Sequence, residues 1–184
     1  MKKTAAAKTS PKKIQEKQLT LYFMRHAKAE DPDRSLYPDD SKRPLSREGK
    51  KQIEEVAEGL DRTKLRVDRL FSSPYVRARE TAAVVAEKIE FAGKTVYTDA
   101  LCPHAGFGGL RDLIDRCVDG ETVLLVSHEP FLSAAVSGLL TGAADLPVAF
   151  KTAGVCCVDI VSRIPLRAEL RSLVPARILK KIAT

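Results

Sequence analysis

The sequence predicts an α/β fold of three layers, with a mainly parallel central sheet flanked by helices. Apolar runs of strand length alternate along the chain with stretches whose apolar residues recur at helical spacing, and this alternation is typical of parallel sheets. Cationic and imidazole side chains follow directly after two of the apolar runs, at Arg25 and His26 and again at His128. Because ligands of such sheets bind at the carboxyl ends of the strands, these positions indicate one shared site.

Length and composition are those of one ordinary globular domain. The chain has 184 residues, of which 44% are hydrophobic and 30% charged, and domains usually hold about 100–200 residues. No run approaches the roughly 18 apolar residues of a membrane span, and the two N-terminal lysines are not followed by the apolar stretch of a secretory signal. We therefore expect a cytoplasmic protein with no membrane partner.

The net charge of +7 belongs to the two ends of the chain. Residues 1–18 hold six Lys and one Glu, residues 177–184 hold three cations, and the segment between them is close to neutral. Residues 1–18 also lack periodicity, so we expect a disordered basic N-terminal tail and a single domain over residues 19–184. Such a tail is weak evidence for a nucleic-acid surface, and we expect no nucleic-acid partner. Binding through the tail would instead show a steep salt dependence that deletion of residues 1–18 removes.

In the first half of the chain, residues 19–24 are a predicted strand buried on both faces. Residues 27–44 form a polar, proline-containing loop whose length suggests a function. Ser46 is the predicted N-cap of the next helix, a short strand is expected near residues 70–71, and Ser73 is the predicted N-cap of a second helix. The buried faces of the two helices are expected at Ile53, Val56, Ala57 and Leu60 and at Ala78, Ala82, Val85 and Ile89.

The second half of the chain continues the alternation of strands and helices. The predicted elements are a strand at 95–103 that enters the loop HAGFGG, a helix at 109–118, a strand at 121–127, a helix at 130–140, and strands at 153–162 and 168–174. The four cysteines form neither a CxxC motif nor a disulfide ladder. We therefore expect buried free thiols.

The side chains at the strand ends indicate an anion site. Arg25, His26 and His128 are joined there by an arginine of the segment SSPYVRARET, which is Arg77 or Arg79, because both flank the apolar face of their helix. Guanidinium groups suit phosphate oxygens, helix N-termini attract anions, and an imidazole can act as a nucleophile. Two separated histidines without a carboxylate cluster are too few for a zinc site. We therefore expect a site for a phosphoryl group that uses no metal and no cofactor.

Four motifs stand in order along residues 19–176, namely MRHAKAE, RPLSREGKKQ, SSPYVRARETA and VSHEPFLS. Together they resemble the histidine phosphatase superfamily, the phosphoglycerate-mutase-like group, and the first is similar to its RHG motif. The segments KRPLSREG and FKTAGVCCVDI look most like those of SixA-type phosphohistidine phosphatases. The resemblance implies a phosphoglycerate-mutase-like fold, with His26 as the nucleophile. It also implies that Arg25 and Arg77 are the paired arginines and that His128 is the second histidine.

Two positions depart from the pattern of that family. Ala27 replaces the glycine that usually follows the nucleophile, and its Cβ is compatible with this position only if φ is negative. The acidic proton donor that mutase-like members carry after the second arginine motif is missing, since LCP occupies that stretch. Asp99 and His104 lie nearby as substitute candidates, although structural roles fit both of them better.

The missing acid favours a phosphohistidine substrate. Imidazole, whose conjugate acid has a pKa of about 6.5, leaves phosphorus with less help from an acid than a sugar alkoxide does. We therefore expect hydrolysis of phosphohistidine on a protein through a phospho-His26 intermediate, at a site where His26 and His128 lie together and are both open to solvent. Arg43 is expected to add a substrate contact, the partner is expected to be a phosphocarrier or phosphorelay protein, and a monomer would suffice. The alternatives are a small-molecule phosphomonoesterase and a non-catalytic module that binds a phosphorylated partner.

Overall fold

Six strands of the described chain form one mixed sheet, in the order β3-β2-β4-β1-β5-β6. The structure, a computed structural model, describes residues 18–184, so the tail expected at residues 1–18 lies outside the described residues except for its last one. The strands are β1 (Leu19–Arg25), β2 (Arg69–Ser72), β3 (Val96–Tyr97), β4 (Thr122–Ser127), β5 (Val155–Arg163) and β6 (Leu166–Val174). β3, β2, β4 and β1 run parallel to one another, whereas β5 and β6 are antiparallel to their neighbours. The prediction of a mainly parallel sheet is confirmed.

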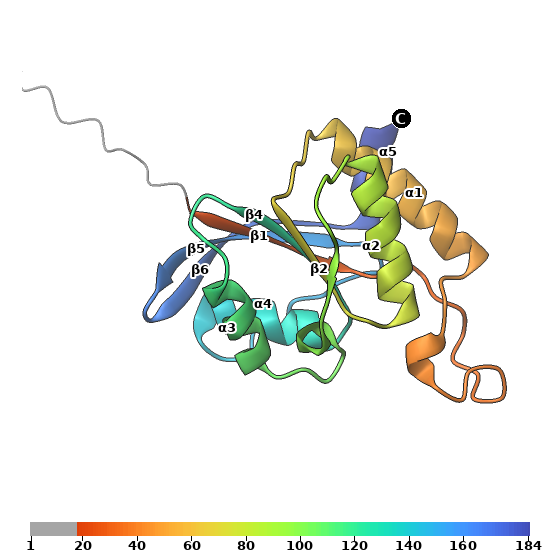
Figure 1. Ribbon diagram of the computed structural model, residues 1–184, viewed down its shortest axis with the longest axis horizontal. Coiled ribbons are helices and arrows are strands. Elements are labelled where there is room, and N and C mark those ends of the chain that lie inside the picture. Colours follow the sequence, from red (N-terminus) through yellow and green to blue (C-terminus); the bar gives the residue numbers. More distant parts are fainter. Residues whose placement is uncertain (1–17) are drawn as a thin grey trace, which may run out of the picture.

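Helices cover both faces of the sheet and complete three layers (Figure 1). One face carries α1 (Arg47–Arg62), α2 (Val76–Lys88) and α5 (Ala176–Ala183), and the other carries α3 (Phe107–Asp115) and α4 (Phe131–Thr141). Short 3-10 turns occur at η1 (Asp40–Lys42) and η2 (Asp99–Leu101). Every residue predicted for the buried faces of the first two helices is buried.

The central strands are buried on both faces, as their apolar runs predict. Along β1, Phe23 joins the apolar core on the side of α3 and α4, whereas Met24 joins the core on the side of α1, α2 and α5. Leu125 and Leu124 of β4 divide in the same way, because successive side chains of a strand point to opposite faces. The residues that follow β1 and β4 are therefore held on a rigid support.

The strand register brings three predicted site segments to one edge of the sheet. Arg25 at the end of β1 lies opposite Ser127 at the end of β4, and Ser72 at the end of β2 lies opposite Val126. The main-chain N–H of His26 donates to the carbonyl oxygen of Ser127 at 3.0 Å. The segments that follow β1, β2 and β4 therefore leave the sheet side by side.

The two helices predicted to begin at serine caps differ in how they start. Ser46 caps α1, since its hydroxyl oxygen accepts from the N–H of Gly49 at 3.0 Å. The prediction of Ser73 as the N-cap of α2 is wrong by two residues, because Tyr75 occupies the N-cap and makes no side-chain cap bond. The N–H of Ser73 still donates to the carbonyl oxygen of Val126 in β4, so the chain needs two more residues to leave the sheet before the helix begins.

The C-terminal helix α5 is missing from the predicted elements. It has only eight residues, which is too short for a clear helical period, and Ile178 and Ile182 remain partly exposed. The helix packs against α1 at Gly59, where an added Cβ would lie 2.1 Å from the carbonyl oxygen of Leu179. The position of α5 therefore depends on a close backbone contact that no side-chain pattern predicts.

Two further expectations bear on the described chain. Within residues 18–184, no helix combines the length and the apolar character needed to cross a bilayer. All four cysteines are free, with Cys117, Cys156 and Cys157 buried and Cys102 partly exposed. The expectation of buried free thiols therefore holds for all but Cys102.

Gly59→Ala is expected to destabilise the domain by about 1–3 kcal/mol, the range for overpacking a filled contact, because the added Cβ would strike the backbone of α5. Gly108→Ala in α3 is the matched control, since no heavy atom lies within 4 Å of its added Cβ and alanine has the higher helix propensity. Urea unfolding of both variants and the parent measures the two effects. Equal stability of Gly59→Ala and the parent would contradict the packing of α5 on α1.

Candidate functional site

His26 and His128 follow β1 and β4 directly and lie together at the edge of the sheet. The centroids of their imidazole rings are 4.9 Å apart, with an angle of 55° between the ring planes. The parallel register of the two strands is the cause, because it places the last residues of β1 and β4 opposite each other. The structure thus brings together two histidines that are far apart in the sequence.

The hydrogen bonds of His26 define which ring nitrogen carries the proton. Nδ1 lies 2.7 Å from the carbonyl oxygen of Ala27, and because a carbonyl oxygen can only accept, Nδ1 is the N–H donor. Nε2 accepts a bond from Nε of Arg77 at 3.3 Å, which assigns the unprotonated state to Nε2 and engages its lone pair. Both contacts therefore make Nε2 the unprotonated nitrogen of the ring.

Ala27 fits its position beside His26 without backbone strain. The φ angle of Ala27 is not positive, so its Cβ is compatible with this position. Its N–H donates to Oγ1 of Thr81 in α2 at 3.1 Å. This bond ties the segment after β1 to α2.

Arg77, and not Arg79, is the arginine of α2 that lies in the cluster. Arg77 keeps 4% of its surface exposed, and besides its bond to His26 it donates from Nη1 to the carbonyl oxygen of Asp40 at 2.8 Å and from Nη2 to Oδ2 of Asp40 at 2.9 Å. Arg79 is exposed, and its guanidinium lies 4.9 Å from the ring centroid of Tyr97. Burial thus selects the arginine that helical periodicity leaves open and that the resemblance implies.

Arg25 and Arg43 surround the histidines without bonding to them. Nη1 of Arg25 donates to the carbonyl oxygen of Phe150 at 2.7 Å, while its Nε is buried without a hydrogen-bond partner among the described residues. Arg43 donates from Nε to Oδ1 of Asp40 at 2.8 Å and from Nη1 to the carbonyl oxygen of Glu30 at 2.7 Å. Asp40 therefore joins Arg43 to the arginine that contacts His26.

Both histidines are neutral because they are buried among positive charges. Burial lowers the pKa of His26 from 6.5 to about 3 and the pKa of His128 to about 2. The nearby guanidiniums of Arg77, Arg25 and Arg43 lower both pKa values as well. A protonated imidazole is therefore disfavoured here, whereas an anion would be attracted.

The two histidines are more enclosed than expected. His26 keeps 8% of its surface exposed and His128 keeps 1%, so the expectation that both are open to solvent is wrong. The ring of Tyr75 covers His128 at 5.0 Å between centroids, and the guanidinium of Arg77 lies 5.0 Å from the centre of the Tyr75 ring. Both ring nitrogens of His128 are buried without a hydrogen-bond partner in the described chain. Since buried polar atoms are normally paired, these nitrogens mark a place suited to a polar ligand.

Asp99 and His104, the candidates for a proton donor, are not joined to this cluster. Both residues are exposed, and Oδ1 of Asp99 accepts from Sγ of Cys102 at 3.7 Å. Neither residue makes a hydrogen bond or an ion pair with His26 or His128. In the part of the chain that the structure describes, His, Cys, Asp and Glu side chains do not gather in groups of three or more that could hold a metal ion.

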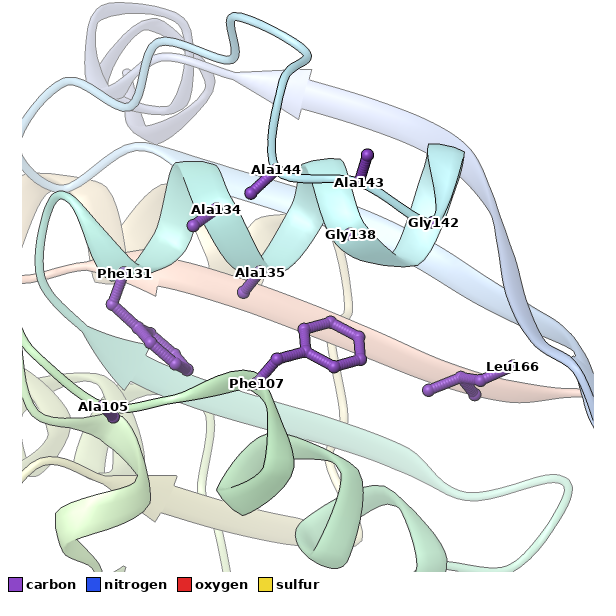
Figure 2. Close-up of a pocket in the computed structure, with 10 residues that line it drawn as sticks. All are labelled: Ala105, Phe107, Phe131, Ala134, Ala135, Gly138, Gly142, Ala143, Ala144 and Leu166. Atoms are coloured by element: carbon purple, nitrogen blue, oxygen red, sulfur yellow. The ribbon is translucent and has the colours of Figure 1, made fainter.

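An apolar cavity of about 520 Å³ lies apart from the cluster, between α3 and α4 (Figure 2). It is lined by Ala105, Phe107, Phe131, Ala134, Ala135, Gly138, Gly142, Ala143, Ala144 and Leu166. These residues include neither the histidines nor the arginines of the cluster and carry no charge. The cavity therefore offers no groups for binding an anion.

Two residues of the cluster, Asp40 and Tyr75, are absent from the sequence-based candidates. Asp40 lies in the long polar loop three residues before Arg43, with which it forms an ion pair, and this spacing of acid and arginine is the signal that points to it. Tyr75 gives no comparable signal, because an aromatic residue before a helix is common at sites without function.

Comparison with known proteins finds relatives of this chain. A family model described as the histidine phosphatase superfamily (branch 1) matches residues 21–102, the segment that holds His26, Arg43 and Arg77. The phosphohistidine phosphatase SixA of Escherichia coli strain K12 is 27% identical over 145 residues, which cover 77% of this chain and 86% of that protein.

Solved structures share the fold. The structure of the protein histidine phosphatase SixA complexed with tungstate has a TM-score of 0.74 at 24% identity, and the match covers 87% of this chain and 99% of that chain. A phosphoglycerate mutase from Bacillus anthracis strain Sterne has a TM-score of 0.69 at 16% identity, with 92% and 98% covered. The expectation of a phosphoglycerate-mutase-like fold is confirmed. In its matched segment and in its Escherichia coli relative, the chain is therefore similar to the histidine phosphatase superfamily, and it shares the fold of the solved structures.

Proposed function

We propose that this chain is a phosphatase that hydrolyses phosphohistidine on a protein, through a phosphoryl group carried by His26. Similarity to the histidine phosphatase superfamily supports phosphatase activity, and the Escherichia coli relative is named a phosphohistidine phosphatase. The observation that carries the proposal is the state of His26, whose Nε2 is unprotonated on a neutral ring and accepts a bond from the guanidinium of Arg77. A neutral nucleophile among fixed cations suits attack on a phosphoryl group.

In the first step, the bound phosphoryl group takes over the Nε–H of Arg77 that Nε2 of His26 accepts in the structure. The lone pair released in this way attacks phosphorus, and the bond from phosphorus to the substrate nitrogen breaks. The electron pair of that bond stays on the nitrogen, and the substrate ring, protonated on its other nitrogen, leaves as neutral imidazole while the phosphoryl group is transferred to His26. Negative charge is spread over three phosphoryl oxygens in the transition state. The guanidiniums of Arg25 and Arg77 and the N–H of His128 would stabilise this charge, and because they are in place before the reaction they need little reorganisation.

In the second step, water attacks the phosphoryl group on His26. The bond between phosphorus and Nε2 breaks, its electron pair returns to the ring, and inorganic phosphate leaves. The bond from Nδ1–H to the carbonyl oxygen of Ala27 would keep the ring in one orientation through both steps. The same carbonyl would stabilise the positive charge that the ring gains while it is phosphorylated.

The leaving group favours a phosphohistidine substrate over a phosphate ester. A phosphohistidine ring takes up the proton that it needs from water, on its other nitrogen, and then leaves as neutral imidazole, whereas an alkoxide needs an acid placed at its oxygen. The candidates for such an acid, Asp99 and His104, are exposed and bond to neither histidine of the cluster. The proposed partner is therefore a phosphocarrier or phosphorelay protein that presents its phosphohistidine at the surface, with Arg43 as an additional contact at the rim of the site.

A phosphohistidine peptide should be dephosphorylated about a hundredfold faster, in kcat/KM, than the phosphoserine peptide of the same sequence, because the ester lacks the help of a general acid. Phosphate release from both peptides and from a set of sugar phosphates measures the preference. Faster release from the sugar phosphates would favour a small-molecule phosphomonoesterase. Absence of release from every substrate would favour a module that binds phosphorylated partners without turnover.

The control for this assay is the nucleophile itself. His26→Ala should lower phosphate release by at least about a thousandfold, while His104→Ala, which replaces an exposed histidine, should leave it unchanged. Mass spectrometry at neutral pH should detect an acid-labile phosphoryl group on the wild-type protein and none on His26→Ala. A phosphorylated or fully active His26→Ala protein would show that another residue is the nucleophile.

The stability of the domain should fall as the pH drops below 6.5. Histidines of the unfolded chain take up protons near pH 6.5, whereas burial holds the pKa of His26 at about 3 and that of His128 at about 2 in the folded state. Between these values the unfolded state binds more protons, so each histidine removes about 1.4 kcal/mol of unfolding free energy per pH unit. Urea unfolding at pH values from 7 down to 4.5 measures this slope, and His128→Asn should reduce it. A slope unchanged by that substitution would contradict a neutral, buried His128.

A further inference from the structure

We infer that Asp40 is a positioning residue of this site, which holds the guanidinium of Arg77 against Nε2 of His26. The inference rests on the proposed function, because it gives Asp40 a part in the reaction of His26. It assigns a role to η1, the turn that the long polar loop places beside the N-terminal end of α2.

Asp40 takes up two of the three nitrogens of Arg77. Nη1 donates to the carbonyl oxygen of Asp40 at 2.8 Å, and Nη2 donates to Oδ2 of the same residue at 2.9 Å. The third nitrogen, Nε, donates to Nε2 of His26 at 3.3 Å. One residue thus fixes the outer end of the planar group in two places, and the inner end faces the nucleophile.

Asp40 is also the counter-charge of a buried cation. Burial lowers the pKa of Arg77, and the charge of Asp40 acts in the opposite direction. Among residues 18–184, the ion pair of Arg77 is the one with Asp40, while the nearby Arg43 carries the same charge as Arg77. Without the carboxylate, Arg77 would lose a hydrogen bond, and its charge would be repelled by Arg43 with no anion between them. Its orientation relative to His26 would then no longer be fixed.

The carboxylate is itself held in place and ionised. Its Oδ1 accepts from Nε of Arg43 at 2.8 Å. Burial acts to raise the pKa of the Asp40 carboxyl, but the bonds and charges of Arg43 and Arg77 outweigh it and hold the pKa below its usual range. The N–H of Leu45 donates to Oε2 of Glu80 in α2 at 2.7 Å, which fastens the loop after η1 to the helix of Arg77. Asp40 is therefore a fixed anion, which suits orientation and does not suit proton donation.

The carboxylate does not occupy the whole of the place that a phosphoryl group would take. Asp40 bonds to Arg77 and Arg43, but Nε of Arg25 and both ring nitrogens of His128 are buried without partners in the described residues. Each Nη of Arg77 also has a second N–H besides the one donated to Asp40. A phosphoryl group can therefore bind while Asp40 keeps its bonds, and this favours orientation of the arginine over competition for it.

Asp40→Asn tests this role, with Asp33→Asn as the matched control. Asp33 belongs to the same loop, and its carboxylate accepts from Ser35 and bonds to none of the arginines of the site. Asp40→Asn should lower kcat/KM for a phosphohistidine peptide about ten- to a hundredfold, as expected for a misplaced catalytic group, and should weaken the binding of inorganic phosphate in calorimetry. Asp33→Asn should change neither value. Wild-type activity of Asp40→Asn, or equal or tighter phosphate binding, would overturn the inference, and tighter binding would identify Asp40 as a competitor of the phosphoryl group.

A double-mutant cycle separates orientation of Arg77 from other effects of Asp40. In the Arg77→Ala background, Asp40→Asn should change kcat/KM by less than about twofold, because the group that it positions is gone. A larger loss in that background would show that Asp40 acts by another route and would overturn the inference. If circular dichroism shows that Asp40→Asn does not fold, Asp40→Glu takes its place in every comparison. That variant keeps the charge but displaces it, so a partial loss is expected and wild-type behaviour would overturn the inference.

Phosphate binding also keeps this inference apart from the proposed function. If the wild-type protein releases phosphate from no substrate, the proposed function fails. Weaker binding of inorganic phosphate by Asp40→Asn than by Asp33→Asn would still support the orientation of Arg77 by Asp40, and equal binding would overturn it.

Discussion

The parallel pairing of β1 with β4 is the constraint on which the site depends. Its register sets Arg25 beside Ser127, so the next residues along the two strands, His26 and His128, leave the sheet as neighbours. A shift of one residue in this pairing would turn side chains to the opposite face of the sheet and separate the two rings. Because β1 and β4 are buried on both faces, such a shift would disrupt the packing of their side chains against the helices on each side. The hydrophobic core therefore determines where the reactive pair lies.

The electrostatics of the site work against the stability of the fold. Burial keeps both histidines neutral at pH values where free histidines take up protons, and buried nitrogens of Arg25 and His128 have no partner among the described residues. A bound phosphoryl group would offset the free-energy cost of these unpaired groups, since its oxygens would accept hydrogen bonds from the guanidiniums and from the imidazole N–H. The groups that disfavour the empty site are thus the groups that would favour the bound anion, a relation that is common at functional sites.

Most of the fold and the centre of the site can be predicted from the sequence, because both depend on local patterns of residues. The apolar runs of β1 and β4 and the helical spacing of Ile53 or Ala82 are repeated signals, and each of those elements is present. The choice of Arg77 over Arg79 required the resemblance, since both flank the apolar face, and burial in the structure agrees with it. Three features rest on contacts between segments far apart in the chain and have no local signal. These are the late start of α2 after Ser73, the close approach of α5 at Gly59, and the bond from Arg77 to Asp40.

The most direct test of the proposed chemistry is an experimental structure of the protein with vanadate, an analogue of the phosphoryl group during transfer. We predict one vanadate at the edge of the sheet, with Nε2 of His26 bonded to vanadium and with its oxygens contacted by Arg25, Arg77 and His128. Vanadate bound at another place in the molecule, or bound here with Nε2 of His26 turned away from the metal, would contradict the site described above.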